Sequence, residues 1–157
     1  AQVTGLDAAQ AYTAIAGAEA LFTSRGDNSG TNKKELSIWE EAGIIPEGGW
    51  YLETGQGMGA TLRIADEKNA YTMTDRGTYL AQQESLILII LVEGDQILFN
   101  PYGIILVNPE KHPGLGINYL GAMKLVEFIT GQKGQGIIRE FGKEKFGQPL
   151  FYPDIIK

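Results

Sequence analysis

The 157-residue chain contains no cysteine, which excludes disulfide bonds, thiolate metal sites and cysteine nucleophiles. His112 is its single histidine and lies in the turn-like segment "EKHPG", where we expect it at the surface. Because a transition-metal site usually takes several histidine or cysteine ligands, we predict neither a metal site nor a cofactor. Glu53 could act as a base, but no nucleophile accompanies it in the sequence, so we predict no catalytic residue.

Positive charge and long apolar runs are also scarce. The 13 lysines and arginines face 19 aspartates and glutamates, and the net charge of -6 argues against a nucleic-acid partner. The longest apolar run, "LILIILV" at 86–92, is too short to cross a bilayer and predicts a buried strand. The opening "AQVTGLDAAQ" shows neither a methionine nor a signal peptide, so we expect a processed or truncated chain.

Helical and strand patterns alternate over the first part of the chain. We predict helices over 6–20, from Ser29 to Gly43, over 55–69 and over 75–83, and strands over 20–24, 49–54, 70–74 and 86–93. Short connections between alternating elements predict an α/β fold, a three-layer sandwich with a mainly parallel sheet. Four aromatic residues are expected in cores: Tyr12, Trp39, Trp50 and Phe99.

The pattern changes after Glu93. Residues 96–114 predict strand, turn, strand and loop, and two helices follow over about 117–130 and 132–141. We therefore assign an α/β domain to residues 1–100 and a region of strand and helices to residues 101–157.

Two loops combine an arginine with hydroxyl groups at a predicted strand end. The first contains Ser24, Arg25, Ser29, Gly30 and Thr31, and it leads into a helix whose first amides can attract an anion. In parallel sheets, ligands bind where such loops meet the starts of helices. The alternative is that Ser29 only caps the helix while Arg25 pairs with Asp27.

The second loop contains Thr74, Asp75, Arg76 and Thr78. Its alternative interpretation is likewise a helix cap and a surface salt bridge. If both strands are parallel, the two arginines converge at one edge of the sheet. A third loop with Gly55, Gly57 and Gly59 allows a close backbone approach, but its spacing is not that of a dinucleotide or phosphate-loop motif.

Four segments, "SRGDNSGTNKKEL", "WYLETGQGMGATL", "YTMTDRGTYL" and "LFNPYGIILVNP", closely resemble the substrate-binding proteins of tungstate-type ABC transporters, as does the ending "GQPLFYPD". The resemblance covers nearly all of residues 20–154. It implies the two-lobed periplasmic-binding-protein fold of the second type, of which this chain would be the second lobe plus the returning segment of the first lobe. The family's N-terminal segment, which supplies further anion ligands, has no counterpart here, so we expect half a site.

The resemblance implies an extracytoplasmic solute receptor, not an enzyme, that binds a tetrahedral oxyanion, tungstate or molybdate, and delivers it to an ABC permease. It implies a periplasmic or extracellular location, with membrane anchoring left open. It carries over the oxyanion ligands Ser24, Arg25, Ser29, Gly30, Thr31, Thr74, Asp75, Arg76 and Thr78, of which Arg25 is singled out as a direct ligand.

Residue chemistry refines this expectation. A fully deprotonated dianion needs donors alone, whereas phosphate usually carries a proton and benefits from a carboxylate acceptor. We therefore expect Asp27 and Asp75 to brace arginines or cap helices. The alternatives are a phosphate or sulfate receptor, and an enzyme or regulatory domain for a phosphate-bearing ligand. Self-association of residues 101–157 is a further alternative.

Overall fold

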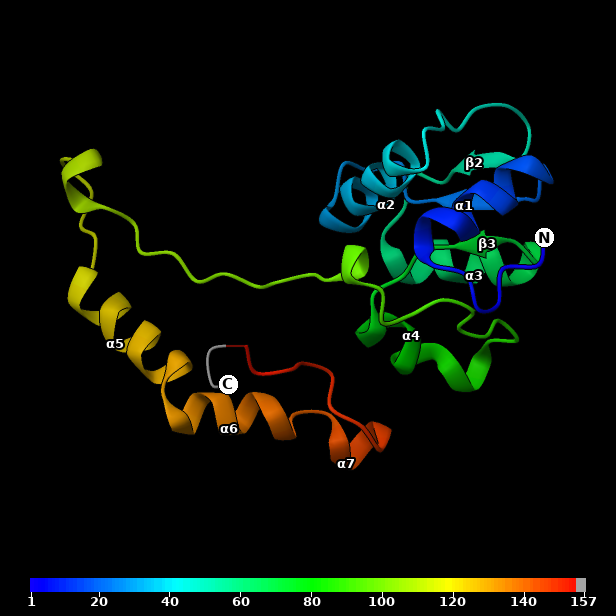
Figure 1. The fold of residues 1–157 in the computed structure, drawn as a ribbon. Helices are drawn as coiled ribbons and strands as arrows, with labels where there is room; N and C mark the ends of the chain where they lie inside the picture. Colours follow the sequence, from blue (N-terminus) through cyan, green and yellow to red (C-terminus); the bar gives the residue numbers. More distant parts are fainter. Residues whose placement is uncertain (155–157) are drawn as a thin grey trace. The chain divides into compact units, whose positions relative to one another are not determined.

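The structure, a computed structural model, describes residues 1–154 (Figure 1). The chain divides into two units, Ala1–Asn100 and Pro101 onward, which Figure 1 colours blue to green and yellow-green to red respectively. The last three residues assigned to the second region, 155–157, lie outside the described residues.

Three short parallel strands form the sheet of the first unit: β1 (Phe22–Ser24), β2 (Tyr51–Glu53) and β3 (Tyr71–Thr72). Their order across the sheet is β2-β1-β3, with Phe22 opposite Tyr51 on one side and Tyr71 on the other. Because every pairing is parallel, the carboxyl ends of all three strands lie at one edge of the sheet.

The strand order places helices on both faces of the sheet. Helix α2 (Gly30–Glu41) connects β1 to β2. Helix α3 (Met58–Lys68) connects β2 to β3, which lies on the other side of β1. Right-handed crossovers in opposite directions put these two helices on opposite faces. Two further helices complete the unit, α1 (Ala8–Gly17), which packs on α2, and α4 (Arg76–Gln82), which packs on α3 (Figure 1). The predicted three-layer α/β architecture is confirmed.

Local capping explains why the predicted helices form where they do. Asp7 makes a capping box with Gln10 at the start of α1, and Ser29 accepts a hydrogen bond from the Asn32 amide at the start of α2. Gly43, with φ of 69°, takes the left-handed conformation expected just after α2.

The core of the first unit lies between the sheet and helices α1 and α2. Trp39 and Phe22 are fully buried there, and the rings of both contact Tyr12. Trp50 is partly buried against the same cluster. The prediction was wrong for Phe99, which is 58% exposed.

The apolar run at 86–92 is not a strand, contrary to prediction. Its backbone is held by side chains, since the amides of Ile87 and Leu88 donate to Asp66 Oδ1 and the Tyr79 hydroxyl donates to the Leu88 carbonyl. Leu91 and Val92 pack against the core, but Ile87 and Ile89 are each 71% exposed. A strand requires a neighbouring strand for its hydrogen bonds, and none pairs with this segment among the described residues.

Within residues 101–154, the second unit has three α-helices and little core. Helix α5 (Tyr119–Thr130) packs on α6 (Gln132–Glu140), and both were predicted; α7 (Lys143–Phe146) was not. No residue of α5 is buried. The predicted strands within 96–114 are absent, and short 3-10 turns occupy Gln96–Leu98 and Pro109–Lys111 instead. His112 is exposed, as predicted.

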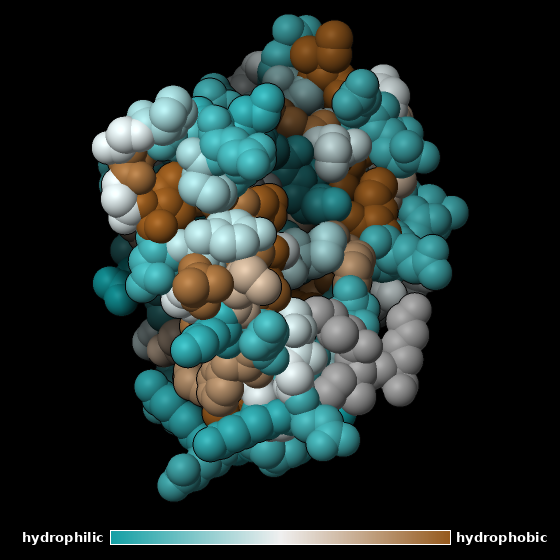
Figure 2. All heavy atoms as spheres, turned by 90° about the vertical axis from the view of Figure 1, so that its left-hand side faces the viewer, coloured by the Kyte–Doolittle hydropathy of each residue, from teal (hydrophilic) through white to brown (hydrophobic). Residues whose placement is uncertain are grey.

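Apolar side chains therefore remain on the surface of the second unit. On the face that Figure 2 shows, brown apolar atoms lie among teal polar ones. Within the second unit, the exposed large apolar residues include Leu115, Leu120, Leu125, Phe128, Ile137 and Phe141.

Candidate functional site

The two arginine loops follow adjacent strands of the sheet. Arg25 comes directly after β1, and Arg76 opens α4 shortly after β3, which pairs with β1. The chain leaves β1 toward β2 on one side and returns to β3 on the other, so these loops flank the point where the strand order reverses. In open α/β sheets this switch point is where ligands bind.

The turn after β1 is tight and is closed by Asp27. Gly26 has a φ of 59°, and a Cβ there would lie 2.8 Å from Glu53 Cβ, so only glycine fits without rearrangement. The Arg25 guanidinium donates to Asp27 Oδ2 through Nε and Nη2. Hydrogen bonds from the Ser29 side chain and from Arg25 hold the pKa of Asp27 below its ordinary value. The prediction that Asp27 braces an arginine is confirmed.

Helix α2 begins with groups that can donate to a ligand. Neither the amides of Gly30 and Thr31 nor the Thr31 hydroxyl donates a hydrogen bond within residues 1–154. Nη1 of Arg25 likewise makes no hydrogen bond there. A helix start with a neighbouring guanidinium suits a negatively charged group.

Ser24 lies beneath this loop. It is 1% exposed, and its hydroxyl donates to Glu35 Oε2 at 2.7 Å. Because a hydroxyl carries one hydrogen, Ser24 in this arrangement has none left for an anion. In this arrangement Ser24 supports the loop, and its role as an oxyanion ligand stays a prediction.

In the second loop, the acidic residue and a hydroxyl also bind each other. Asp75 accepts hydrogen bonds from the Thr78 amide at 2.8 Å and the Thr78 hydroxyl at 2.7 Å, so it caps α4, as predicted. The single hydroxyl hydrogen of Thr78 is therefore donated to Asp75. Arg76 forms a salt bridge with Glu93, and the Thr74 hydroxyl donates to the Asp75 carbonyl at 3.2 Å.

The glycine-rich third loop is joined to the first by Thr54. The Thr54 amide donates to the Ser24 carbonyl at 2.9 Å, and its hydroxyl lies 2.8 Å from that of Thr61 on α3. Gly57 precedes α3 without any side-chain cap. All three predicted loops therefore lie along the same edge of the sheet.

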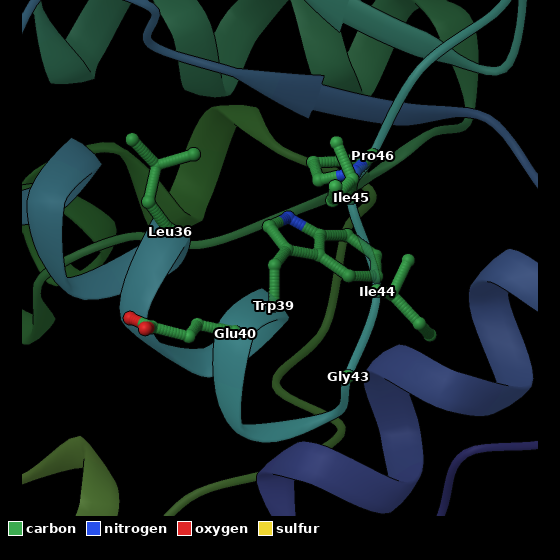
Figure 3. A pocket seen from close by; sticks show the side chains of 7 residues that line it. All are labelled: Leu36, Trp39, Glu40, Gly43, Ile44, Ile45 and Pro46. Atoms are coloured by element: carbon green, nitrogen blue, oxygen red, sulfur yellow. The ribbon is translucent and has the colours of Figure 1, made fainter.

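Two hollows in the first unit differ in their relation to this edge. One, of about 310 Å³, lies at the far end of α2 and is lined by apolar side chains with Glu40 at its side (Figure 3). The other, of about 550 Å³, includes Thr74 and Arg76 in a largely apolar lining from α1, β3, α4 and residues 87–94. Neither resembles a pocket built from donors alone.

Sequence reasoning missed Glu35, a carboxylate 2% exposed on α2. It accepts hydrogen bonds from Ser24, from the Tyr51 hydroxyl at 2.7 Å and from Trp39 Nε1 at 3.2 Å. Burial raises the pKa of Glu35, although these hydrogen bonds oppose the shift. The only sequence signal was its position, three and four residues from the helix's apolar positions Ile38 and Trp39.

Within residues 1–154, no three histidine, aspartate or glutamate side chains come together as metal ligands. In the same residues, no helix has the length and apolarity needed to cross a membrane.

The family model described as "PBP superfamily domain" matches residues 2–133, so the chain belongs to this periplasmic-binding-protein superfamily. It is 54% identical over 136 residues to "Tungstate-binding protein TupA" of Peptoclostridium acidaminophilum, covering 87% of this chain and 47% of that protein. Among solved structures, the tungstate ABC transporter protein of Geobacter sulfurreducens is 48% identical, with a TM-score of 0.77, over 88% of this chain and 58% of that one. The tungstate-binding protein TupA of Desulfovibrio alaskensis G20 is 41% identical, with a TM-score of 0.79, over 97% and 62% respectively.

The chain spans about half the length of the curated relatives it matches, between 46% and 50%. The matched fold and sequence confirm the family resemblance noted from the four loop segments.

Proposed function

We propose that this chain forms part of the solute-binding component of an ABC transporter and contributes half of a site for a tetrahedral oxyanion, tungstate or molybdate. The observation that carries the proposal is the position of the Arg25 and Arg76 loops at the carboxyl ends of adjacent parallel strands. The relatives named for tungstate binding support the choice of ligand.

In this proposal Arg25 binds the anion directly through Nη1, and the Gly30 and Thr31 amides and the Thr31 hydroxyl add donors. Thr74 and Arg76 approach from the second loop. Ser24, Ser29, Asp75 and Thr78 hold the two loops in shape. Asp27 and Asp75, the carboxylates of the two arginine loops, already accept from protein donors, which favours a ligand without protons over phosphate.

The remaining parts of the proposal follow from the class of protein. The receptor works outside the cytoplasmic membrane, in the periplasm or at the cell surface, and delivers its ligand to a membrane permease without chemical change.

The test is ligand-induced stabilisation of this chain and of a version extended at its beginning to the length of its relatives. Ligand at 100 times its dissociation constant raises the free energy of unfolding by about 2.7 kcal/mol. We expect tungstate and molybdate to raise the melting temperature of the extended version much more than sulfate or phosphate do. The 157-residue chain should respond weakly, because it carries only part of the donors.

Arg25→Lys provides the site-specific control. Lysine keeps the charge but loses the planar fork of donors, so we expect about tenfold weaker tungstate binding. Lys33→Arg, an exposed change on α2, should leave binding unchanged. Tighter binding of phosphate than of tungstate, or an Arg25→Lys variant that binds normally, would refute the assignment.

A further inference from the structure

Glu35 is an unusual residue for the core beneath an anion site. A buried carboxylate costs free energy unless hydrogen bonds compensate it, and Glu35 has three donors, from Ser24, Tyr51 and Trp39. Its negative charge also lies behind a loop that is proposed to attract a dianion. A residue with these costs calls for a role beyond filling space.

The carboxylate determines the direction of a short chain of hydrogen bonds. Because it can only accept, the Ser24 hydrogen must point toward Glu35. The lone pairs of Ser24 Oγ then accept from the Gly26 amide at 3.3 Å and from Asn32 Nδ2 at 3.2 Å. This orients the Asn32 amide so that its Oδ1 accepts from the Asn28 amide at 3.0 Å.

These bonds hold the loop at two of its residues, Gly26 and Asn28. Gly26 and Asn28 both have left-handed backbones, with φ of 59° and 61°. Their amides are the two that Ser24 and Asn32 hold from below. Arg25 lies between β1 and Gly26, and α2 starts at Gly30, two residues after Asn28. The conformation of the loop therefore decides where Arg25 and the first amides of α2 present their donors.

We propose that Glu35 is a positioning residue, which through Ser24 and Asn32 fixes the loop at residues 25–28 and so aims Arg25 and the first amides of α2 at one ligand. The identity of the ligand rests on the function proposed above. The effect of Glu35 on the conformation of residues 25–28 is independent of that function.

The two oxygens of Glu35 allow a matched comparison. Oε2 accepts from Ser24, whereas Oε1 accepts from Tyr51 and Trp39, away from the loop. Glu35→Gln keeps the size but must place its NH2 group against either Ser24 or Tyr51, both of which need an acceptor there. Ser24→Ala removes the link to the loop. Tyr51→Phe removes a hydrogen bond to the other oxygen of the same carboxylate, and the Tyr51 hydroxyl makes no hydrogen bond with residues 25–28.

The first measurement is amide hydrogen exchange by NMR on the 157-residue chain. For each variant, the change in exchange rate of the Gly26 and Asn28 amides is divided by the average change over the other amides of the chain. We expect this ratio to be about tenfold in Glu35→Gln and Ser24→Ala, and to stay within about threefold in Tyr51→Phe. If Glu35→Gln does not fold, Ser24→Ala decides alone. Equal ratios in all variants would overturn the proposal.

The second measurement is the affinity of the extended version for sodium tungstate and sodium molybdate. Glu35→Gln and Ser24→Ala should weaken binding by about tenfold or more, and Tyr51→Phe by no more than about threefold, even where all three lower stability alike. Binding as weak in Tyr51→Phe as in Glu35→Gln would reduce Glu35 to a structural core residue. If the unsubstituted protein binds neither anion, the proposed function fails, and the exchange rates still decide the role of Glu35.

Discussion

At the scale of single residues, the two aspartates of the arginine loops accept hydrogen bonds from protein donors. Asp27 accepts from Arg25 and from the Ser29 amide, and Asp75 accepts twice from Thr78. Charge-assisted bonds of this kind are stronger than neutral ones and fix the geometry of both partners. The two aspartates therefore shape the loops.

The raised pKa of Glu35 leads to a prediction of how the stability of the chain depends on pH. Because burial raises the pKa of Glu35, the folded chain binds this proton more readily than the unfolded chain does. The group's contribution to stability is then greatest below its ordinary pKa and is lost as the pH rises through the raised pKa of the folded state. We expect the stability of the unsubstituted chain relative to Glu35→Gln to fall as the pH rises through that window, in urea denaturation at a series of pH values.

Asp27 supplies a control of opposite sign. Its pKa is lowered by hydrogen bonds from the Ser29 side chain and from Arg25, so its contribution is present above its ordinary pKa and is lost as the pH falls through the lowered value. Relative to Asp27→Asn, the unsubstituted chain should lose stability on acidification. A Glu35→Gln difference that followed the same direction would contradict the assigned shift.

At the scale of elements, the connection from β1 to α2 depends on one glycine. Gly26 combines a left-handed backbone with a close approach to Glu53. Gly26→Ala should lower the free energy of unfolding by about 2 kcal/mol, from backbone strain plus the displaced Glu53 side chain. Gly17→Ala in α1, where a Cβ meets open space, should leave stability unchanged or raise it slightly. Equal effects of the two substitutions in urea denaturation would disprove this account of the turn.

The elements that sequence analysis predicted are those that local signals specify. Three helices are capped by a side chain that accepts from an amide three residues further on: Asp7, Ser29 and Asp75. The start of each of these helices can therefore be predicted from its own short segment. The apolar run at 86–92 has no such signal, because a strand exists only if another strand pairs with it. Its composition predicted burial, yet the carboxylate of Asp66 holds its backbone instead.

The candidate site shows the same division between local and non-local information. The positions of the Arg25 and Arg76 loops follow from strand ends and helix starts, which are visible in sequence. The network beneath them joins Ser24 on β1, Glu35 on α2 and Tyr51 on β2, residues brought together only by the parallel pairing. From sequence alone, a glutamate beside two lysines in a helix is expected to be exposed to solvent. The burial of Glu35 and its hydrogen bonds could therefore be recognised only from the fold.

At the scale of the whole molecule, the two units differ in how much they bury. The first unit has a core of contacting aromatic and aliphatic side chains around Trp39 and Phe22. The second has no buried residue in α5, and its apolar side chains extend along both α5 and α6. Exposed apolar area on this scale marks a surface that gains free energy by contact with another surface.

We predict that the 157-residue chain self-associates through the second unit. Sizing chromatography at rising concentration should show a growing apparent mass, and sodium sulfate should strengthen the association because it strengthens apolar burial. Leu125→Glu and Phe128→Glu, on the exposed surface of α5, should return the chain to a monomer. Ile45→Glu removes an apolar residue that is 85% exposed in the first unit and should have no effect. A monomer at all concentrations, with well-dispersed NMR signals from α5 and α6, would mean that these helices are stable without any partner surface.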